Sequence, residues 1–506
     1  MAPTKISRRD MLKALGLASA GAALAACGTT PTVPTTSATQ APVAAGEAPA
    51  PTTAPAAADA GKKYKILHWA QGPEPTDPNA VLEAGQTRRV AYQLIADQYM
   101  KEHPDVEIEW YRFPAGSNVQ EWLLARMTAQ DAPDIYWANT EDLWPHINKN
   151  WALDFTEYMN MPNPYVSGNT AWKDQFQDVA IFSQTGPDGK LYGVNMDGAG
   201  VLIVYNQQAF TEAGIESVPK TWTEFIDAQK KLQAKGYIPF GANLNPDTCC
   251  YPHWAMAHLY NQLTYNTILT IDDDKNQVIT AKEVAQHAQK GDALDWDAYL
   301  KVAHLLKEWS QFFPVGYEGT TDYRQLFRQG KVAMYMEGNW AISEFQSSPT
   351  PFEINWTAFP VITKDIWPQS TENVVRIQGA WGGMQYHVPG YLKEKEPDKI
   401  PIIMDWLMFS SKPENVTNCL KETSMVSLTK GAEAVPELAP FNQPYDRAVP
   451  YQSWQTLSSS GLQAEYKLWQ AYLPSSMSDQ EFIDKAKKDF DAEVQKVLEA
   501  NPDWKV

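Results

Sequence analysis

Cysteine is scarce in this sequence, with four residues in a chain of 506. Cys27 lies near the N-terminus, so the rest of the chain holds only Cys249, Cys250 and Cys419, which allow at most one disulfide bond within a monomer. A scaffold held together by disulfides is therefore excluded. Cys249 and Cys250 are adjacent, and three states stay open: free thiols, a strained vicinal disulfide, and a bond from one of them to Cys419.

Positive charge is also in short supply. Lys and Arg number 42 against 60 Asp and Glu, which gives a formal net charge of -18. Nucleic acid is a poor candidate partner, because binding it requires neutralisation of phosphates by basic side chains. The sequence also lacks a Gly-x-Ser-x-Gly elbow, a Walker loop and a Gly-x-Gly-x-x-Gly run, and its eight histidines include no zinc-binding pair four residues apart. We expect no cofactor.

The hydrophobic run from Ala14 to Ala26 is too short for a transmembrane helix, which needs about 20 residues. Basic residues precede it, so residues 1–26 are typical of a secretion signal. Within this signal "SRRDMLK" resembles the twin-arginine export motif, with Met11 where Phe is usual, and "LAAC" resembles the lipobox of bacterial lipoproteins. We expect acylation of Cys27 to anchor the protein at the extracellular face of the cell membrane, or in the periplasm if the host has an outer membrane. The alternative is an ordinary signal in which Cys27 is incidental.

Residues 27–62 are rich in Ala, Pro and Thr and poor in apolar bulk, which predicts a disordered linker. Residues 63–506 follow, a length of about 440 residues that exceeds the usual size of a single core. We therefore expect two lobes.

Hydrophobic periodicity after residue 63 predicts alternating strands and helices. A β-prone run at 64–70 is followed by helical spacing over 87–102 and by strand-like alternation at "VEIEWYRF", which indicates a βαβ unit with parallel strands. Thr221 precedes a helical segment and Glu224 follows three residues later, the arrangement of a capping box. Further strands are expected at "VLIVYN", "VAMYME", "INWTAF" and "GGMQYHV", and helices at "DWDAYLKVAHLLKEWSQFF", "PIIMDWLMFSS" and "SDQEFIDKAKKDFDAEVQKVLEA".

Four stretches resemble one known family: "APDIYWANTEDLW", the run from "DGKLYGVN" to "KKLQAKG", "FRQGKVAMYMEGNWAI", and "DWLMFSSKPENV" with "SMVSLTKG". The chain is similar to the extracellular solute-binding proteins of ATP-binding-cassette importers, in the group that contains maltose-binding protein. Asn195 stands where the family usually has proline, and Thr223 where it usually has Asp.

The resemblance implies an α/β fold of the periplasmic-binding-protein type II class, with two discontinuous lobes that close on a ligand about a hinge. The N-terminal lobe would comprise 63–197 and 361–425, and the C-terminal lobe 198–360 and 426–506. Crossings between the lobes would fall near residues 196–200, 359–362 and 425. A closed cleft excludes water, which strengthens hydrogen bonds to the ligand.

Twelve residues are candidate ligand contacts because aromatic rings can stack on sugars and planar amides or carboxylates can bind their hydroxyls. Most stand after expected strands, where α/β sheets bind ligands, or where the resemblance places the cleft. They are Trp69, Gln71, Trp137, Asn139, Glu141, Asp142, Asp197, Trp254, Glu337, Asn339, Trp340 and Trp381. For each tryptophan the competing interpretation is an ordinary core or loop aromatic, and for Asp197 it is a cap or turn residue.

The segment "DDDKNQVITAKE" has partial similarity to a calcium-binding loop. Asp272, Asp274, Asn276 and Glu283 stand at loop positions that supply oxygen ligands, but Gln277 occupies the position that needs glycine. A polar hairpin before a helix is the simpler interpretation, and we expect no metal.

We therefore expect a lipid-anchored, monomeric substrate-binding protein that captures a carbohydrate and delivers it to importer permease subunits, with no catalytic residues. Two alternatives stay open. One is a secreted, lipid-anchored carbohydrate-active enzyme such as a glycoside hydrolase, which would use paired carboxylates. The other is a binding protein for a non-sugar solute. The sequence does not identify the sugar, its number of rings or the permease.

Overall fold

The computed structural model describes residues 63–82, 88–114, 117–245, 253–275, 278–319 and 321–506, and only the backbone of residues 140, 141, 145, 146 and 148. The predicted signal (1–26), the linker (27–62) with Cys27, and the residues Cys249, Cys250 and Asn276 lie outside the described part. Among the described residues, no helix combines the length and the apolar character that crossing a membrane requires.

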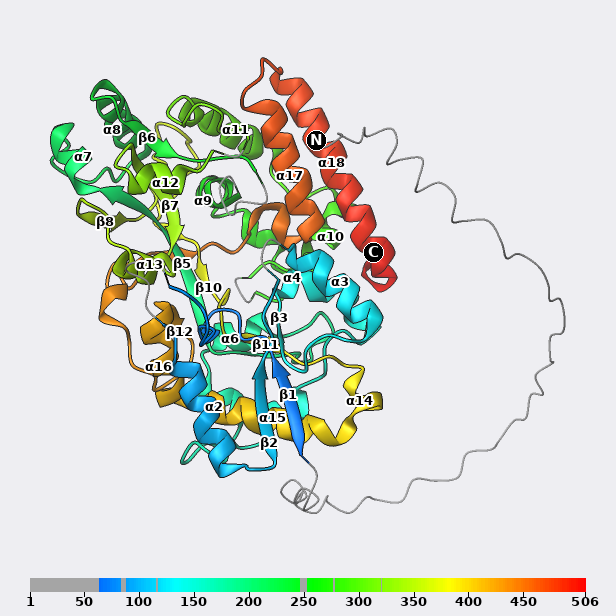
Figure 1. Cartoon of the computed structure of the whole chain (residues 1–506). Helices are drawn as coiled ribbons and strands as arrows, with labels where there is room; N and C mark the ends of the chain where they lie inside the picture. The colour runs from blue at the N-terminus through cyan, green and yellow to red at the C-terminus, as the bar shows by residue number, and fades with distance from the viewer. Residues whose placement is uncertain (1–62, 83–87, 115–116, 246–252, 276–277, 320) are drawn as a thin grey trace, which may run out of the picture. The chain divides into compact units, whose positions relative to one another are not determined.

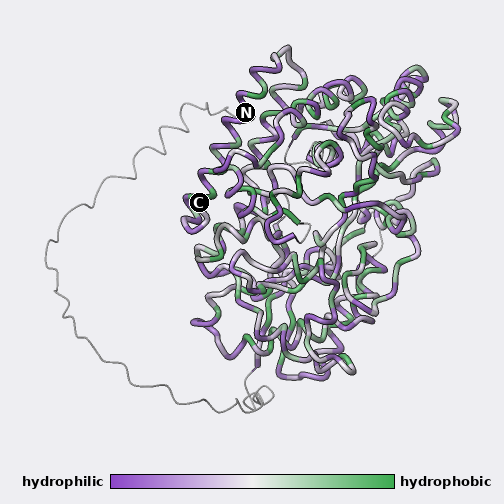
Figure 2. Tube along the Cα trace, turned by 180° about the vertical axis from the view of Figure 1, so that it is seen from behind, coloured by the Kyte–Doolittle hydropathy of each residue, from purple (hydrophilic) through white to green (hydrophobic). Residues whose placement is uncertain are grey.

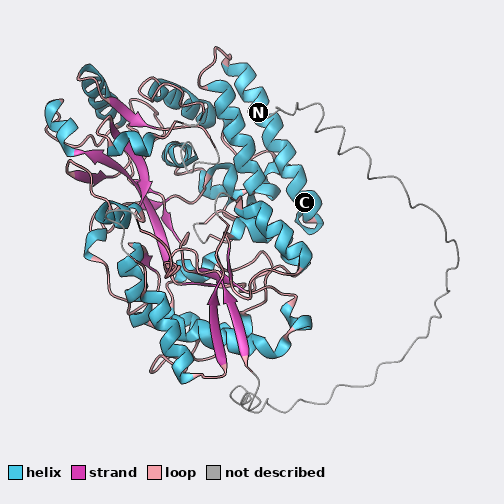
Figure 3. Ribbon diagram, viewed as in Figure 1, coloured by secondary structure: helices cyan, strands magenta, loops and turns pink. Residues whose placement is uncertain are grey.

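The N-terminal half begins with the predicted βαβ unit. Strand β1 (Tyr64–His68) pairs in parallel with β2 (Val106–Trp110), and helix α2 (Ala91–Glu102) connects them (Figures 1 and 3). A parallel bridge from His68 to Ile135 brings the next segment alongside β1. The remaining strands of this region are β3 (Tyr136–Trp137), β4 (Val194–Asn195) and β11 (Gln385–His387), in the order β3-β11-β4.

Helices from two distant parts of the sequence pack on these strands. The earlier set is α3 (Val119–Ala129), α4 (Thr140–Leu143), α5 (Thr156–Met159) and α6 (Asp178–Ser183), with the 3-10 helix η1 (Trp144–Lys149) after α4. The later set is α14 (Leu392–Lys395), α15 (Ile400–Ser410) and α16 (Pro413–Thr423). Their apolar side chains join one cluster, here called the first core, which runs from Ile66 to Leu202 and again from Ala380 to Phe441, with Ile342 of α13 (Ala341–Ser347) added.

A second sheet is organised around the long strand β5 (Asp197–Asn206). Its order is β10-β5-β7-β6, and β8 and β12 also pair with β5. The strands are β6 (Ile238–Gly241), β7 (Val332–Gly338), β8 (Ile354–Thr357), β10 (Gln378–Gly379) and β12 (Val426–Ser427), while β9 (Val375–Arg376) pairs separately with β13 (Arg447–Ala448).

The helices around this second sheet build a second core of mainly apolar and aromatic side chains. They are α7 (Gln207–Glu212), α8 (Trp222–Ala234), α9 (His253–Leu263), α10 (Ala281–Lys290), α11 (Trp296–Ser310), α17 (Ser459–Tyr472) and α18 (Asp479–Ala500). Helices α12 (Tyr323–Arg328) and α13 form a smaller third cluster with β7. The capping box predicted from Thr221 and Glu224 is present at the start of α8. Green and purple segments alternate along α18 in Figure 2, as expected for a helix with one face on the core.

The two cores divide the chain at three places, and two of these differ from the prediction. The first of these places lies within β5. Phe359 and Ile362 belong to the second core, Phe359 beside Trp222 and Trp309, so the second crossing lies instead between Ile377 and Ala380. The third lies between Phe441 and Val449 rather than near residue 425. We propose lobe limits that follow these cores.

A carboxyl group is enclosed in the second core. Glu465 is 1% exposed, and it accepts hydrogen bonds from the Tyr299 hydroxyl at 2.9 Å and from the Ser453 hydroxyl. None of the ion pairs among the described residues involves Glu465. Burial raises the pKa of Glu465 to about 8.

The free energy of unfolding should therefore fall as the pH rises from about 5 to 8. Between the unfolded pKa of Glu465 and its raised folded value, the native state binds more protons than the unfolded chain, so a rise in pH favours unfolding. Urea titrations at several pH values measure this slope, and Glu465→Gln should reduce it. If the free energy of unfolding changes equally with pH in the unmodified protein and in Glu465→Gln, the raised pKa of Glu465 is contradicted.

Candidate ligand-binding site

Strand β5 passes from one core into the other, and all ten of its residues are buried. Ala199 and Leu202 belong to the first core, whereas Val201 and Ile203 belong to the second. Strands β10 and β12 pair with the start of β5, and β7 and β8 pair with its later part. The start of β5 with β10 and β12 is here called the hinge sheet.

Two tryptophan rings cover the same face of this hinge sheet. Gly338 pairs with Val201 and Gly379 pairs with Ala199, so the two glycines and these partners share one face. A Cβ atom at Gly338 would lie 2.2 Å from the Trp340 ring, and one at Gly379 would lie 2.4 Å from the Trp381 ring. Each indole therefore lies directly on a glycine backbone, in space that any other residue would fill.

The opposite face of the hinge sheet is occupied by the first core. A Cβ atom at Gly200 would lie 3.1 Å from the Phe441 ring, and one at Gly198 would lie 3.3 Å from the Leu428 side chain. Gln378 pairs with Gly200, so its side chain shares this second face at the edge of the sheet.

A cavity of about 480 Å³ opens beside Trp381. Its walls come from both sides of the hinge. Helix α6 and the turn after it contribute from the side of the first core, and residues within 273–286 and 448–456 contribute from the side of the second core. The aromatic lining consists of Trp144, Phe182 and Trp381, and the amide lining of Gln286, Gln378, Gln385, Gln452 and Gln455. Gln378 Oε1 and Gln452 Nε2 have no hydrogen-bond partner within the described part of the chain.

The charged side chains at the cavity are mainly acidic. Asp273, Asp274 and Glu283 line it together with a single lysine, Lys282. Oxygens of Asp272, Asp274 and Glu283 lie within 4.8 Å of one another. Glu283 also completes the capping box of α10 with Thr280, a structural role that needs no calcium ion.

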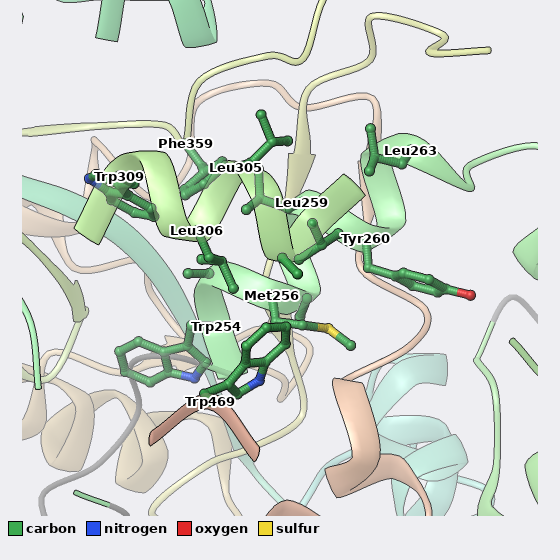
Figure 4. Close-up of a cluster of buried hydrophobic side chains, with 14 of the residues drawn as sticks. Trp254, Met256, Leu259, Tyr260, Leu263, Leu305, Leu306, Trp309, Phe359 and Trp469 are labelled. Atoms are coloured by element: carbon green, nitrogen blue, oxygen red, sulfur yellow. The ribbon is translucent and has the colours of Figure 1, made fainter. Parts of the chain in front are cut away.

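Four of the predicted tryptophans lie at or near the hinge sheet. Trp381 lines the cavity, and Trp340 packs against both cores. The Trp254 ring lies 5.9 Å from the Trp340 ring and belongs to the buried cluster of α9 (Figure 4). Trp137 Nε1 donates a hydrogen bond to the carbonyl of Gly382 at 2.8 Å, which connects it to the loop after Trp381.

Other predicted residues are placed differently. Trp69 is 2% exposed and stacks on Phe113 with ring centroids 4.5 Å apart, so its ring is enclosed in the first core. Gln71 is exposed. Asn139 is partly buried, and Asp142 accepts a hydrogen bond from the Ser459 hydroxyl of α17. The Glu141 side chain lies outside the described part.

Three predicted polar residues are buried and engaged by the protein itself. Asn339 accepts from Gly200 N at 2.7 Å and donates to the Ser424 carbonyl at 2.6 Å. Glu337 forms an ion pair with Arg324 at 2.8 Å. Asp197 is fully buried and accepts from Met384 N at 2.8 Å. None of the three lines the cavity, because the backbone or Arg324 occupies each group.

Sequence reasoning missed most of the cavity lining. Trp144 closes the quoted stretch "APDIYWANTEDLW", so its position in that motif was an available signal. Phe182 and the five glutamines come from α6, α10, β10, β11 and the segment before α17, and no motif marks them. They meet only through the tertiary fold.

The sequence matches the family model described as "Bacterial extracellular solute-binding protein" over residues 84–386. The chain is 26% identical over 195 residues to the sn-glycerol-3-phosphate-binding periplasmic protein UgpB of Rhizobium meliloti, covering 37% of this chain and 41% of that protein. It is 21% identical over 268 residues to the multiple sugar-binding protein of Streptococcus mutans, covering 53% of this chain and 58% of that protein. The matches thus span about half the length of these curated relatives.

Solved structures with a similar fold cover most of both chains. A chitin oligosaccharide binding protein superimposes with a TM-score of 0.61 at 19% identity, covering 86% of this chain and 99% of that one. The solute-binding protein RafE in complex with raffinose superimposes with a TM-score of 0.58 at 18% identity, covering 85% of this chain and 99% of that one. A protein from a study of xylan utilization by Caldanaerobius polysaccharolyticus superimposes with a TM-score of 0.61 at 20% identity, covering 84% of this chain and 99% of that one. These likenesses establish the two-lobed type II fold, and the family match over 84–386 establishes that the chain belongs to the bacterial extracellular solute-binding proteins.

Proposed function

We propose that this protein captures a sugar or oligosaccharide in the cavity beside Trp381 and delivers it to the permease of an ATP-binding-cassette importer. The observation that carries the proposal is the composition of the cavity wall: three aromatic rings together with five glutamines, two of which have unpartnered amide atoms. Aromatic rings pack against the C–H faces of sugars, and amides bind their hydroxyl groups.

The charges around the cavity favour an uncharged ligand over a phosphate ester. The lining residues include three carboxylates and one lysine. Arg376, the nearest arginine to Trp381 in the sequence, is 3% exposed and donates to the carbonyls of Phe441 at 2.8 Å and Gln443 at 3.0 Å. Because its guanidinium is committed to the backbone, a bound phosphate would meet mainly negative groups.

Export and anchoring form the second part of the proposal. It rests on the sequence of residues 1–62: a twin-arginine signal, acylation of Cys27 and a linker long enough to let the binding lobes move in solution near the membrane. We infer a monomer that meets its permease there.

A ligand screen by thermal denaturation tests the proposal. Raffinose, chitin oligosaccharides and xylo-oligosaccharides should be compared with glycerol 3-phosphate, and at least one glycan should raise the melting temperature. A ligand at 100 times its Kd stabilises the folded state by about 2.7 kcal/mol, which gives a measurable shift.

Analysis of the same glycans after incubation separates binding from hydrolysis. We expect the glycan to remain intact, as for a binding protein. Release of shorter products would support the glycoside hydrolase alternative, and stabilisation by glycerol 3-phosphate alone would contradict the carbohydrate assignment.

A further inference from the structure

Asp197 is a buried carboxylate at the hinge that faces the loop carrying Trp381. It is 0% exposed, its Oδ1 accepts from Met384 N at 2.8 Å, and the carboxylate also accepts from the backbone of Gly383. Its Oδ2 has no partner among the described side chains and backbone groups. The group is therefore sealed from the cavity, and its hydrogen bonds are directed at the loop of residues 381–384.

This loop has little freedom beyond that contact. A Cβ atom at Gly382 would lie 1.9 Å from Asp197 Oδ1, so the backbone rests directly against the carboxylate. On its other side the loop packs against Gly72: a Cβ atom at Gly383 would lie 2.7 Å from the Gly72 Cα atom. The Gly382 carbonyl also accepts a hydrogen bond from Trp137 Nε1. A shift of the carboxylate would thus move the backbone beside Trp381 and the partner of Trp137.

We propose that Asp197 is a positioning residue that anchors the loop of residues 381–384 and so fixes the Trp381 ring at the wall of the cavity. The expected effect of Asp197 on ligand affinity rests on the function proposed above. The anchoring of the loop is independent of that function. Asp197 acts on the ligand only through Trp381, because it does not itself line the cavity.

The groups that face Asp197 from neighbouring elements are uncharged at neutral pH. They are the hydroxyls of Tyr92 on α2 and Tyr386 on β11 and the thiol of Cys419 on α16. His68, whose ring lies 4.6 Å from that of Tyr386, is neutral because burial lowers its pKa to about 3. No ion pair to Asp197 is present in the described part of the chain.

Burial without a basic partner raises the pKa of Asp197 to about 7. The ionised carboxylate makes charge-assisted hydrogen bonds to the two backbone N–H groups, and these weaken on protonation. The loop should therefore tighten as the pH rises through 7. Over the same pH window the ionisation of Asp197 lowers global stability, because its folded pKa lies above its unfolded value. Local order and global stability thus change in opposite directions.

Hydrogen exchange at Gly383 and Met384 in the full chain tests the anchoring without any ligand. After correction for the intrinsic rate, we expect protection of these amides in the unmodified protein to rise about tenfold between pH 6 and pH 8, as charge-assisted bonds replace neutral ones. Asp197→Asn, which stays neutral, should show lower protection with no such rise. The profile of the unmodified protein decides the question even if the variant fails to fold.

Asp134→Asn is the matched control. Asp134 is also a buried carboxylate that accepts a backbone N–H, from Leu67 at 2.7 Å; it is ion-paired with Lys399 at 2.8 Å, and both partners lie outside the loop of residues 381–384. Its substitution should leave the exchange of Gly383 and Met384 unchanged. Equal, pH-independent protection in the unmodified protein and Asp197→Asn would overturn the proposal.

Calorimetry with raffinose, chitin oligosaccharides and xylo-oligosaccharides extends the test to the ligand. For any of them that binds, Kd should be several-fold lower at pH 8 than at pH 6, and Asp197→Asn should abolish that difference. If exchange responds as expected but none of these glycans binds, the loop anchor stands and the carbohydrate assignment fails. If a glycan binds with the same Kd at both pH values and in both proteins, Asp197 does not position Trp381.

Discussion

Replacement of Trp381 by alanine should weaken glycan binding by about 1 to 3 kcal/mol, or roughly five- to 150-fold in Kd. The Trp381 ring lines the cavity and rests on Gly379, so truncation removes a flat apolar wall of the cavity. Calorimetry with the glycan that gives the largest thermal shift measures the loss.

Trp296→Ala provides the control for this substitution. Trp296 is another partly buried tryptophan, but it packs at the edge of the second core against Phe490 and Lys487 and does not line the cavity. It should cost stability without changing Kd. If the two variants bind the glycan equally well, Trp381 is not part of the ligand site.

Gly382→Ala should destabilise the protein by more than about 3 kcal/mol, one of the largest effects that a single methyl group can have. The added Cβ would lie 1.9 Å from Asp197 Oδ1 and 2.2 Å from the Asp197 backbone carbonyl. Removal of the Asp197 side chain cannot relieve the second clash, so the loop itself must move. Urea denaturation monitored by circular dichroism gives the change in stability.

Gly319→Ala is the corresponding control. A Cβ at Gly319 would meet only the Gly316 carbonyl, at 3.6 Å, an ordinary van der Waals distance. We expect a change within about 0.5 kcal/mol. A Gly382→Ala protein as stable as the control would show that the contact between Asp197 and the loop is loose.

The elements of the fold were largely predictable because each carries a local signal. The βαβ unit at the N-terminus, the capping box at Thr221 and the strands "VAMYME" and "INWTAF" were confirmed. These features depend on residues close together in the sequence. The second and third crossings that we propose lie roughly 20 residues beyond the predicted ones, because which core Phe359 joins depends on Trp222 and Trp309, far away in the sequence.

The candidate site was less predictable for the same physical reason. Glycines on both sides of Trp381 signal a position where the backbone can approach closely, and Trp381 lines the cavity. The same kind of signal cannot distinguish a polar group that faces a ligand from one that holds the backbone, as Asn339 and Asp197 do. Gln378, Gln385 and Gln452 come together only when the strands cross, so their neighbours in the sequence contain no trace of the cavity.

The division of the first core between two remote stretches of chain affects how the protein can be made. Strand β11 lies between β3 and β4, and Asn163 donates a hydrogen bond to the carbonyl of Met408, 245 residues further along. A nascent chain that ends before residue 380 lacks this central strand and exposes the apolar face of its neighbours. Because the contacts that complete the core are so distant in sequence, the lobe that is synthesised first cannot finish folding until most of its partner has been translated.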